Sequence, residues 1–156
     1  MLKKSAGILL YRFSDSILNF FLVHPGGPFW AKKDVGAWSI PKGEFEDDEN
    51  PLQAALREFS EETGQIISGN FITLTPVKQG SSKTIYAFAI EHDFDASKLK
   101  SNTFNMEWPP KSGKQKEFPE IDKGQWFDIE TSKLKLNKNQ VAFVEELEKV
   151  LICRQQ

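Results

Sequence analysis

The sequence predicts an α+β fold built around a mixed β-sheet. Strand-like runs of apolar residues dominate the first two thirds of the chain, and one amphipathic helical pattern interrupts them. A second helical pattern follows near the end of the chain. The 156 residues are enough to bury a substantial core, and no repeat or linker-like segment divides them, so we expect one domain over residues 1–156.

The first two strands are predicted to form a hairpin. "SAGILLYRF" (5–13) and "ILNFFLVH" (17–24) are strand-like and flank a short polar turn. Proline and glycine punctuate "HPGGPFWAKKD" (24–34), so this segment is predicted to be a loop. "AWSIPKG" (37–43) then predicts a short strand that Pro41 ends.

A helix is predicted after this strand. Asn50 is a favourable N-cap, and Pro51 occupies the first helical position, where its missing N–H costs nothing. Gly64 fits the position just beyond the helix end, where left-handed backbone is common. One face is apolar at the helical spacing i, i+3, i+4 and i+7, through Leu52, Ala55, Leu56 and Phe59.

The remaining sequence predicts a second hairpin, a long loop, a strand and a helix. "NFITLTPVKQ" (70–79) and "KTIYAFAIEH" (83–92) are strand-like around "GSS". "SNTFNMEWPPKSGKQKEFPEID" (101–122) has little periodicity and is predicted to be a loop. "GQWFDI" (124–129) predicts a short strand, and "NKNQVAFVEELEKVLICR" (137–154) predicts an amphipathic helix. The residues expected to face inward are Val141, Val144, Leu147 and Leu151.

The composition limits the compartments and the classes of partner that we expect for the protein. No apolar run approaches the ~18 residues that span a membrane. No Lys/Arg stripe of the kind that binds duplex nucleic acid is present either. The single cysteine, Cys153, excludes a disulfide within these 156 residues and is interpreted as a packing residue. These features predict a cytoplasmic protein, a monomer or a homodimer, with a small-molecule ligand.

The stretch from residue 43 to residue 64 is unusually acidic. It holds eight carboxylates and one base, Arg57, and therefore sums to −7 in a chain whose net charge is −2. Glu58, Glu61 and Glu62 lie at i, i+3 and i+4 of the predicted helix, so they project from one flank. Their mutual repulsion and the helix dipole together cost about 1–3 kcal/mol. A divalent cation such as Mg²⁺ would offset that cost; the alternative is a solvated acidic face that Arg57 partly neutralises.

The same stretch carries a family signature. Its fixed glycine, glutamate and arginine positions are Gly43, Glu49, Arg57, Glu58, Glu61, Glu62 and Gly64. This spacing resembles the Nudix box of the Nudix hydrolases, over residues 43–65. Phe59 fills the apolar position, whereas Gln65 stands where the family usually has an aliphatic residue. The resemblance implies a Nudix α/β/α sandwich with a mixed central β-sheet.

The resemblance also implies a metal site. The side chains of Glu58, Glu61 and Glu62 would bind one or more Mg²⁺ ions, and the carbonyl of Gly43 often completes the coordination in this family. Mn²⁺ is the expected substitute. Carboxylate and carbonyl oxygens are the ligands that such hard cations prefer.

The other matched residues have implied roles in catalysis or in the fold. Arg57 resembles the arginine that orients the neighbouring glutamate, so Glu58, Glu61 and Arg57 are the expected catalytic residues of the box. Glu49 resembles the structural ion-pair partner of Arg57, and Gly64 has a structural role. The implied reaction is attack of water on a phosphoanhydride in a nucleoside diphosphate that is linked to another moiety.

Residues outside the box complete the predicted site. A further catalytic glutamate from a late loop is expected to be Glu117 or, as second choice, Glu120; the alternative is that both are surface charges. Lys42, directly before the box, and Lys32 are expected to contact substrate phosphates. His24 is interpreted as a structural histidine, since it lacks the spacing of a metal ligand.

Several substrates and one other class of function remain open. The "PKG" that enters the box resembles the dinucleoside polyphosphate and diphosphoinositol hydrolases, so a dinucleoside polyphosphate leads, beside a (d)NTP. Cleavage of an RNA-cap type of substrate is an alternative on the same fold. A nucleotide sensor that binds without turnover is the alternative from another class.

Overall fold

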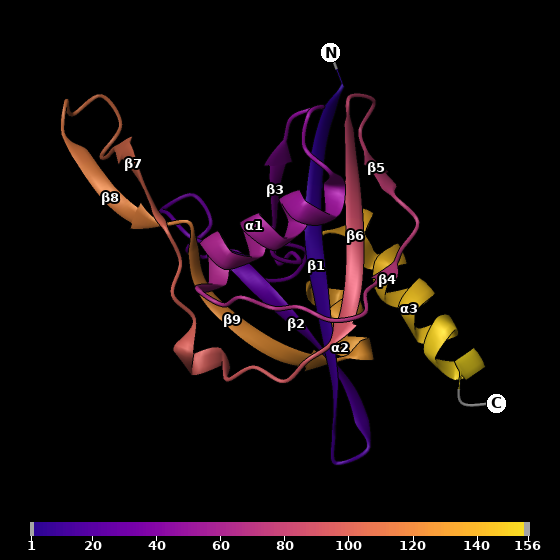
Figure 1. The fold of residues 1–156 in the computed structure, drawn as a ribbon. Helices are drawn as coiled ribbons and strands as arrows, with labels where there is room; N and C mark the ends of the chain where they lie inside the picture. Colours follow the sequence, from indigo (N-terminus) through magenta and orange to yellow (C-terminus); the bar gives the residue numbers. More distant parts are fainter. Residues whose placement is uncertain (1, 155–156) are drawn as a thin grey trace.

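The computed structural model describes residues 2–154 and has a seven-stranded mixed sheet at its centre (Figure 1). The main strand order is β4-β6-β1-β2-β9, with β3 beside β1 and β5 beside β6. The β1–β6 pair is parallel and the other pairs are antiparallel, so the predicted mixed sheet is confirmed. The bounds are β1 (Lys3–Ser14), β2 (Ile17–Pro25), β3 (Lys42–Phe45), β4 (Ile72–Thr73), β5 (Val77–Gln79), β6 (Lys83–Glu91) and β9 (Ile121–Asp128).

The predicted N-terminal hairpin is confirmed as β1 and β2. Tyr11 pairs with Phe20, and Ser14 pairs with Ile17. The two turn residues, Asp15 and Ser16, both have positive φ, of 51° and 66°. Two positive-φ residues in a two-residue turn match the right-handed twist of the strands that they join.

Helices cover both faces of the sheet, which gives the expected α/β/α sandwich. The helix α1 (Pro51–Thr63) lies over one face, with Ala54, Ala55 and Phe59 in the hydrophobic core there. The helices α2 (Ile129–Lys135) and α3 (Val141–Arg154) lie on the other side (Figure 1). The core on that side includes three of the four residues of α3 that were predicted to face inward, Val144, Leu147 and Leu151, while Val141 is half-buried against it.

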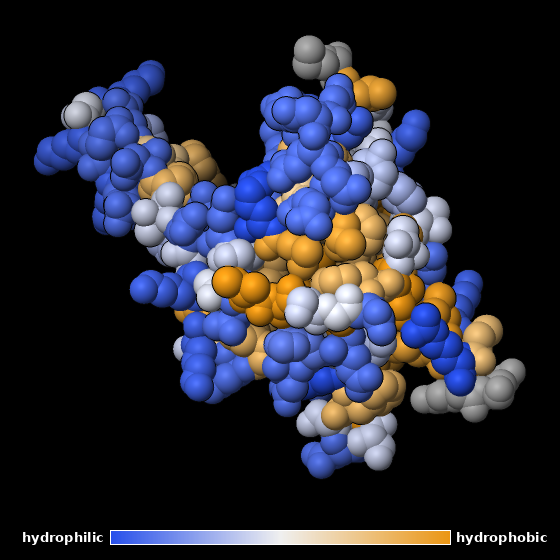
Figure 2. Space-filling view, viewed as in Figure 1, coloured by the Kyte–Doolittle hydropathy of each residue, from blue (hydrophilic) through white to orange (hydrophobic). Residues whose placement is uncertain are grey.

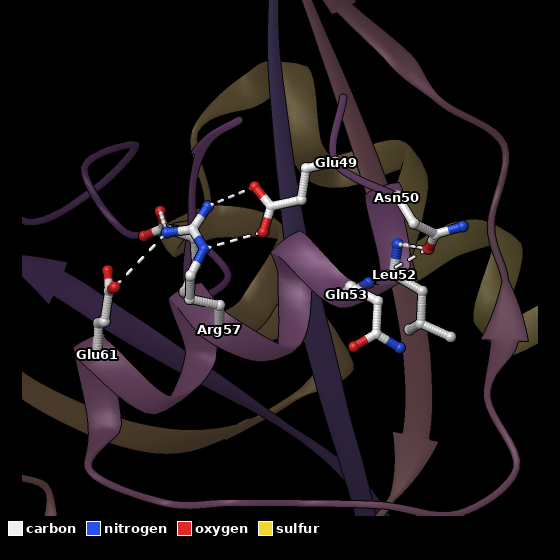
Figure 3. Close-up of polar contacts among 7 residues, drawn as sticks. Glu49, Asn50, Leu52, Gln53, Arg57 and Glu61 are labelled. Carbon is white, nitrogen blue, oxygen red and sulfur yellow. Dashed lines mark hydrogen bonds and ion pairs between the residues drawn. The ribbon is translucent and has the colours of Figure 1, made fainter. Parts of the chain in front are cut away.

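The ends of α1 are confirmed at the residues that the sequence predicts. The Asn50 side chain accepts hydrogen bonds from the backbone N–H groups of Leu52 and Gln53 (Figure 3). Gly64 follows the helix with φ of 79°, in the left-handed region that glycine adopts without strain. These local signals fix where the acidic flank of the helix begins and ends.

Residues 101–122 differ most from the prediction. They contain a separate two-stranded sheet of β7 (Thr103–Glu107) and β8 (Gln115–Pro119) rather than a loop. Phe104 and Phe118 pair across it, with ring centroids 6.0 Å apart. This cross-strand contact stabilises the hairpin, although the segment lacks the alternation of apolar and polar residues that predicts a strand. The hairpin is a mostly hydrophilic projection, separated from the body by an open notch (Figure 2).

Smaller differences concern the ends of other elements. The segment 37–43 forms only isolated bridges at Trp38 and Ser39, and the strand β3 begins at Lys42. The sequence did not predict α2 or the short 3-10 helices η1 (Ala96–Lys98) and η2 (Lys138–Gln140). Cys153 is exposed on the last turn of α3, so its interpretation as a packing residue is wrong. No helix within residues 2–154 has the length and hydropathy of a membrane span.

Candidate active site

Arg57 organises the acidic flank of α1. Its Nε and Nη2 donate to the two carboxylate oxygens of Glu49, at 3.0 and 2.9 Å, and form a bidentate pair (Figure 3). Its Nη1 donates to Glu58 Oε1 at 2.7 Å and lies 3.5 Å from Glu61 Oε1. The hydrogen bonds from Arg57 lower the pKa of Glu49, and those to Glu49 and Glu58 raise the pKa of Arg57. One guanidinium therefore holds three of the carboxylates of the acidic stretch.

Gly43 and Glu58 fit against each other closely. A Cβ atom at position 43 would overlap the carboxylate of Glu58, so only glycine leaves room for this side chain. The Glu58 side chain is only 12% exposed. Burial raises its pKa; the hydrogen bond from Arg57 opposes this change, and the charge of Glu61 adds to it.

Glu62 points into a cavity of about 180 Å³ at the C-terminal end of α1. Its Oε1 accepts a hydrogen bond from the backbone N–H of Lys42 at 3.2 Å. Burial is the main cause that raises the pKa of Glu62 to about 8, and the charge of Glu58 contributes. The cavity is lined by Val23, Pro25, Ser39, Ile40, Lys42, Glu62, Glu120 and Ile121.

The structure separates the two glutamates proposed for the late loop. Glu117 is exposed on β8 of the projecting hairpin. Glu120, the second choice, lines the cavity together with Glu62. Burial raises the pKa of Glu120, and the charge of Glu61 raises it further. Glu120 acts electrostatically on Glu58 and on Glu62, so it belongs to the same acidic group.

Lys42 lies between this cavity and a second one of about 170 Å³. Lys83, from the start of β6, lines the second cavity beside Lys42. Burial and the nearby charge of Lys83 lower the pKa of Lys42. Within residues 2–154, neither lysine forms an ion pair. Lys32, the other lysine expected to contact phosphate, is exposed in the loop after β2 and lines neither cavity.

The second cavity also contains an amide oxygen and an indole ring. The Oε1 atom of Gln79 is buried and has no hydrogen-bond partner among residues 2–154. Trp30, which is 39% exposed, forms part of the wall. A pair of lysines, a free amide oxygen and an indole ring together suit an anionic ligand that also carries hydrogen-bond donors.

The carboxylates fit a hard divalent cation by their chemistry. Glu58, Glu61, Glu62 and Glu120 offer only oxygen atoms, and their charges act on one another in a partly buried space. Two of them are held in separate directions, Glu58 by Arg57 and Glu62 by the N–H of Lys42. Accordingly, no three acidic, histidine or cysteine side chains of residues 2–154 converge on one metal position in these rotamers.

Comparison with known proteins identifies the family. A family model of the NUDIX domain matches residues 1–147. The chain belongs to the NUDIX domain family. Nudix hydrolase 25 of Arabidopsis thaliana is 46% identical over 41 residues, which are 26% of this chain and 23% of that protein, so the match spans less than a quarter of the relative.

Solved structures share the Nudix fold over nearly the whole chain. The NUDIX domain of Shewanella oneidensis NrtR, complexed with ADP ribose, has a TM-score of 0.67 and 15% identity, covering 97% of this chain and 89% of that one. A C. elegans Ap4A hydrolase binary complex has a TM-score of 0.63 and 17% identity, covering 97% and 98%. At these identities the likeness establishes the fold alone. The resemblance and the fold class read from the Nudix box are both confirmed.

Proposed function

We propose that this chain is a Mg²⁺-dependent hydrolase that cleaves a phosphoanhydride in a nucleoside diphosphate linked to another moiety. The observation that carries the proposal is a cavity lined by Glu62, Glu120 and Lys42. The charges of Glu58 and Glu61 act on the two glutamates of this cavity, so all four carboxylates form one acidic group. Carboxylates can hold a cation and accept a proton, and the lysine can hold a phosphate. Hydrolysis of an anhydride requires both functions.

Each residue of the site has a distinct task. Glu58, Glu61 and Glu62, with the Gly43 carbonyl, would hold Mg²⁺ or Mn²⁺. The bound cation would withdraw charge from the phosphoryl oxygens and lower the pKa of a water molecule. Arg57 keeps Glu58 in place through the hydrogen bond of 2.7 Å.

Glu120 is the best-placed group to take the proton of the attacking water. Among residues 2–154, its carboxylate forms no hydrogen bond, whereas those of Glu58 and Glu62 are engaged with Arg57 and Lys42. Its raised pKa makes it a stronger base than an ordinary surface glutamate. We therefore assign to Glu120 the role for which Glu117 was the first choice.

The substrate that we favour is a dinucleoside polyphosphate. Lys42 and Lys83 extend the positive surface beyond the carboxylate cavity, which suits a chain of several phosphates. Trp30 supplies a partly exposed ring against which a base can stack. One structural neighbour is an Ap4A hydrolase and another binds ADP ribose, so both ligand types belong in the test. A (d)NTP, a diphosphoinositol or an RNA-cap type of substrate is the alternative for the same site.

The decisive experiment measures products. The protein is incubated with Mg²⁺ and a panel of phosphoanhydrides, including Ap4A, ATP and ADP-ribose, and the products are separated by chromatography. We expect turnover in the wild type and at least a ~10²-fold lower kcat in Glu58→Gln, the scale of a lost catalytic group. Glu145→Gln, at an exposed position of α3, is the matched control and should keep wild-type turnover. Nucleotide binding without product would favour the sensor instead.

The remaining expectations from the sequence stay predictions. We propose that the chain acts as a single domain, as a monomer or a homodimer, on a small-molecule nucleotide rather than on duplex nucleic acid. A cytoplasmic location rests on the single cysteine, Cys153. Size-exclusion chromatography with light scattering measures the oligomeric state directly.

A further inference from the structure

The pairing of β2 with β9 shifts register next to the proposed site. His24 pairs with Lys123, whereas the next residue, Pro25, pairs with Ile121. Asp122 is therefore an extra residue on β9, which is the definition of a β-bulge. Bulges of this kind change the direction of neighbouring side chains.

The bulge changes which face of the sheet the neighbouring residues occupy. The ammonium of Lys123 lies over Trp38, in the core on the α3 side. Ile121, two residues away, would share that face in a regular strand, yet it packs in the core under α1. Glu120 directly precedes Ile121 and lines the same cavity. The direction of Glu120 thus depends on the bulge.

His24 is buried and contacts the bulge residue Asp122. It is 1% exposed, and its ring packs edge-on against Trp38 with centroids 5.3 Å apart. Its Nδ1 lies 2.9 Å from Asp122 Oδ1, and its Nε2 lies 2.6 Å from the carbonyl oxygen of Lys33. Both ring nitrogens therefore lie at hydrogen-bond distance from an oxygen atom, one on the bulge and one on the loop after β2.

A second contact ties the same segment to the end of β2. The N–H of Gly26 donates to the carbonyl oxygen of Glu120 at 2.8 Å. A Cβ atom at position 26 would overlap the carbonyl oxygen of Pro119, so the two backbones approach as closely as glycine permits. Glu120 is held between this backbone contact on one side and the His24–Asp122 contact on the other.

We infer that His24 is a positioning residue, which fixes the bulge at Asp122 and so aims Glu120 into the carboxylate cavity. The inference rests on the proposed function, in which Glu120 accepts a proton. The alternative is that His24 contributes only to packing beneath the loop that carries Lys33. The two hypotheses predict different double variants. If His24 positions Glu120, the effect of replacing His24 on kcat depends on whether Glu120 is present; if His24 only packs, the two effects are independent.

Two substitutions separate the two contacts of the ring. In His24→Gln the amide reaches the place of Nε2, so the Lys33 contact can survive while the Asp122 contact is lost. In His24→Asn the amide reaches the place of Nδ1, so the opposite holds. Asp122→Ala removes the same contact as His24→Gln from a side chain that is one-third exposed, and it serves if the buried substitution prevents folding.

Steady-state kinetics on the substrate found by the panel, combined with Glu120→Gln, tests the inference. We expect His24→Gln and Asp122→Ala each to lower kcat by about 10–10²-fold, with KM changed by less than about threefold. Adding Glu120→Gln to either should lower kcat by no more than about threefold further. In the His24→Asn background, Glu120→Gln should still lower kcat by about 10²-fold.

A readout without turnover is the amide exchange of Gly26, measured by NMR. Loss of the bulge should speed exchange of this amide by at least about tenfold in His24→Gln and in Asp122→Ala, because its acceptor on Glu120 moves. Lys123→Gln, at the neighbouring position, is the matched control and should leave both kcat and exchange unchanged. Additive effects of Asp122→Ala and Glu120→Gln, or unchanged exchange at Gly26 in folded variants, would overturn the inference. If the wild type cleaves nothing in the panel, the proposed function fails, and the exchange experiment alone decides the inference.

Discussion

Replacing Glu62 by glutamine should stabilise the metal-free protein at alkaline pH. Glu62 is half-buried beside the cavity, and loss of solvent around its carboxylate is the main cause that raises its pKa from the ordinary 4.5 to about 8. Glutamine has nearly the same shape, and its oxygen can still accept the hydrogen bond from the N–H of Lys42. The substitution therefore removes the ionisable group while leaving its main contact in place.

The sign and size of the effect follow from the two pKa values. Between pH 4.5 and about pH 8, the unfolded chain loses the Glu62 proton while the folded protein retains it. The folded state binds more protons in this window, so the free energy of unfolding falls as the pH rises. At about 1.4 kcal/mol per pH unit the full difference corresponds to about 5 kcal/mol. Water entering the cavity reduces this, and we expect about 2–4 kcal/mol between pH 5 and pH 9.

Urea unfolding in EDTA, followed by circular dichroism from pH 5 to pH 9, measures this effect. Glu62→Gln should equal the wild type near pH 5 and exceed it increasingly toward pH 9. Glu145→Gln, the exposed control on α3, should follow the wild-type curve throughout. Parallel curves for Glu62→Gln and the wild type would refute the reasoning, because the buried carboxylate would then carry no cost of ionisation.

Three further predictions concern the same site. Gly43→Ala should lower kcat by about 10²-fold in a folded protein, because its Cβ displaces the Glu58 carboxylate; kinetics beside circular dichroism checks both parts. Mg²⁺ at pH 8 should raise the Tm of the wild type more than that of Glu58→Gln, since a cation that binds only the folded state stabilises it; calorimetry without nucleotide reads this out. Lys83→Gln should raise KM for substrates with three or more phosphates and leave ADP-ribose unchanged, while Lys78→Gln, at an exposed position of β5, changes neither.

The prediction of α1 succeeded because its signals are local. Asn50, Pro51 and Gly64 set the ends through backbone groups within a few residues, and the apolar spacing sets the buried face. The pairing of Glu49 with Arg57 belongs to the same stretch of chain and was implied by the Nudix box. Short-range geometry of this kind is repeated whenever the same residues recur at the same spacing.

The features that the sequence missed depend on contacts between distant segments. The hairpin of β7 and β8 is recognisable only when Phe104 meets Phe118. Lys83 reaches the site because β6 and β3 both pair with β1, so that Lys83 and Lys42 line the same cavity. Neither contact produces a periodic pattern in the sequence, so neither can be predicted from a short stretch of the chain.

The sequence by itself determined the helix, its acidic flank and the family of the chain, because hydrogen bonding near helix ends and burial at a fixed period are local properties. The tertiary structure alone decided that Glu120 rather than Glu117 faces the cavity. The two glutamates are three residues apart, but Glu117 lies on β8, which pairs with β7, whereas Glu120 lies between β8 and β9, where its carbonyl oxygen accepts a hydrogen bond from the N–H of Gly26. Strand register is set by long-range pairing, and a shift of one residue turns side chains to the other face.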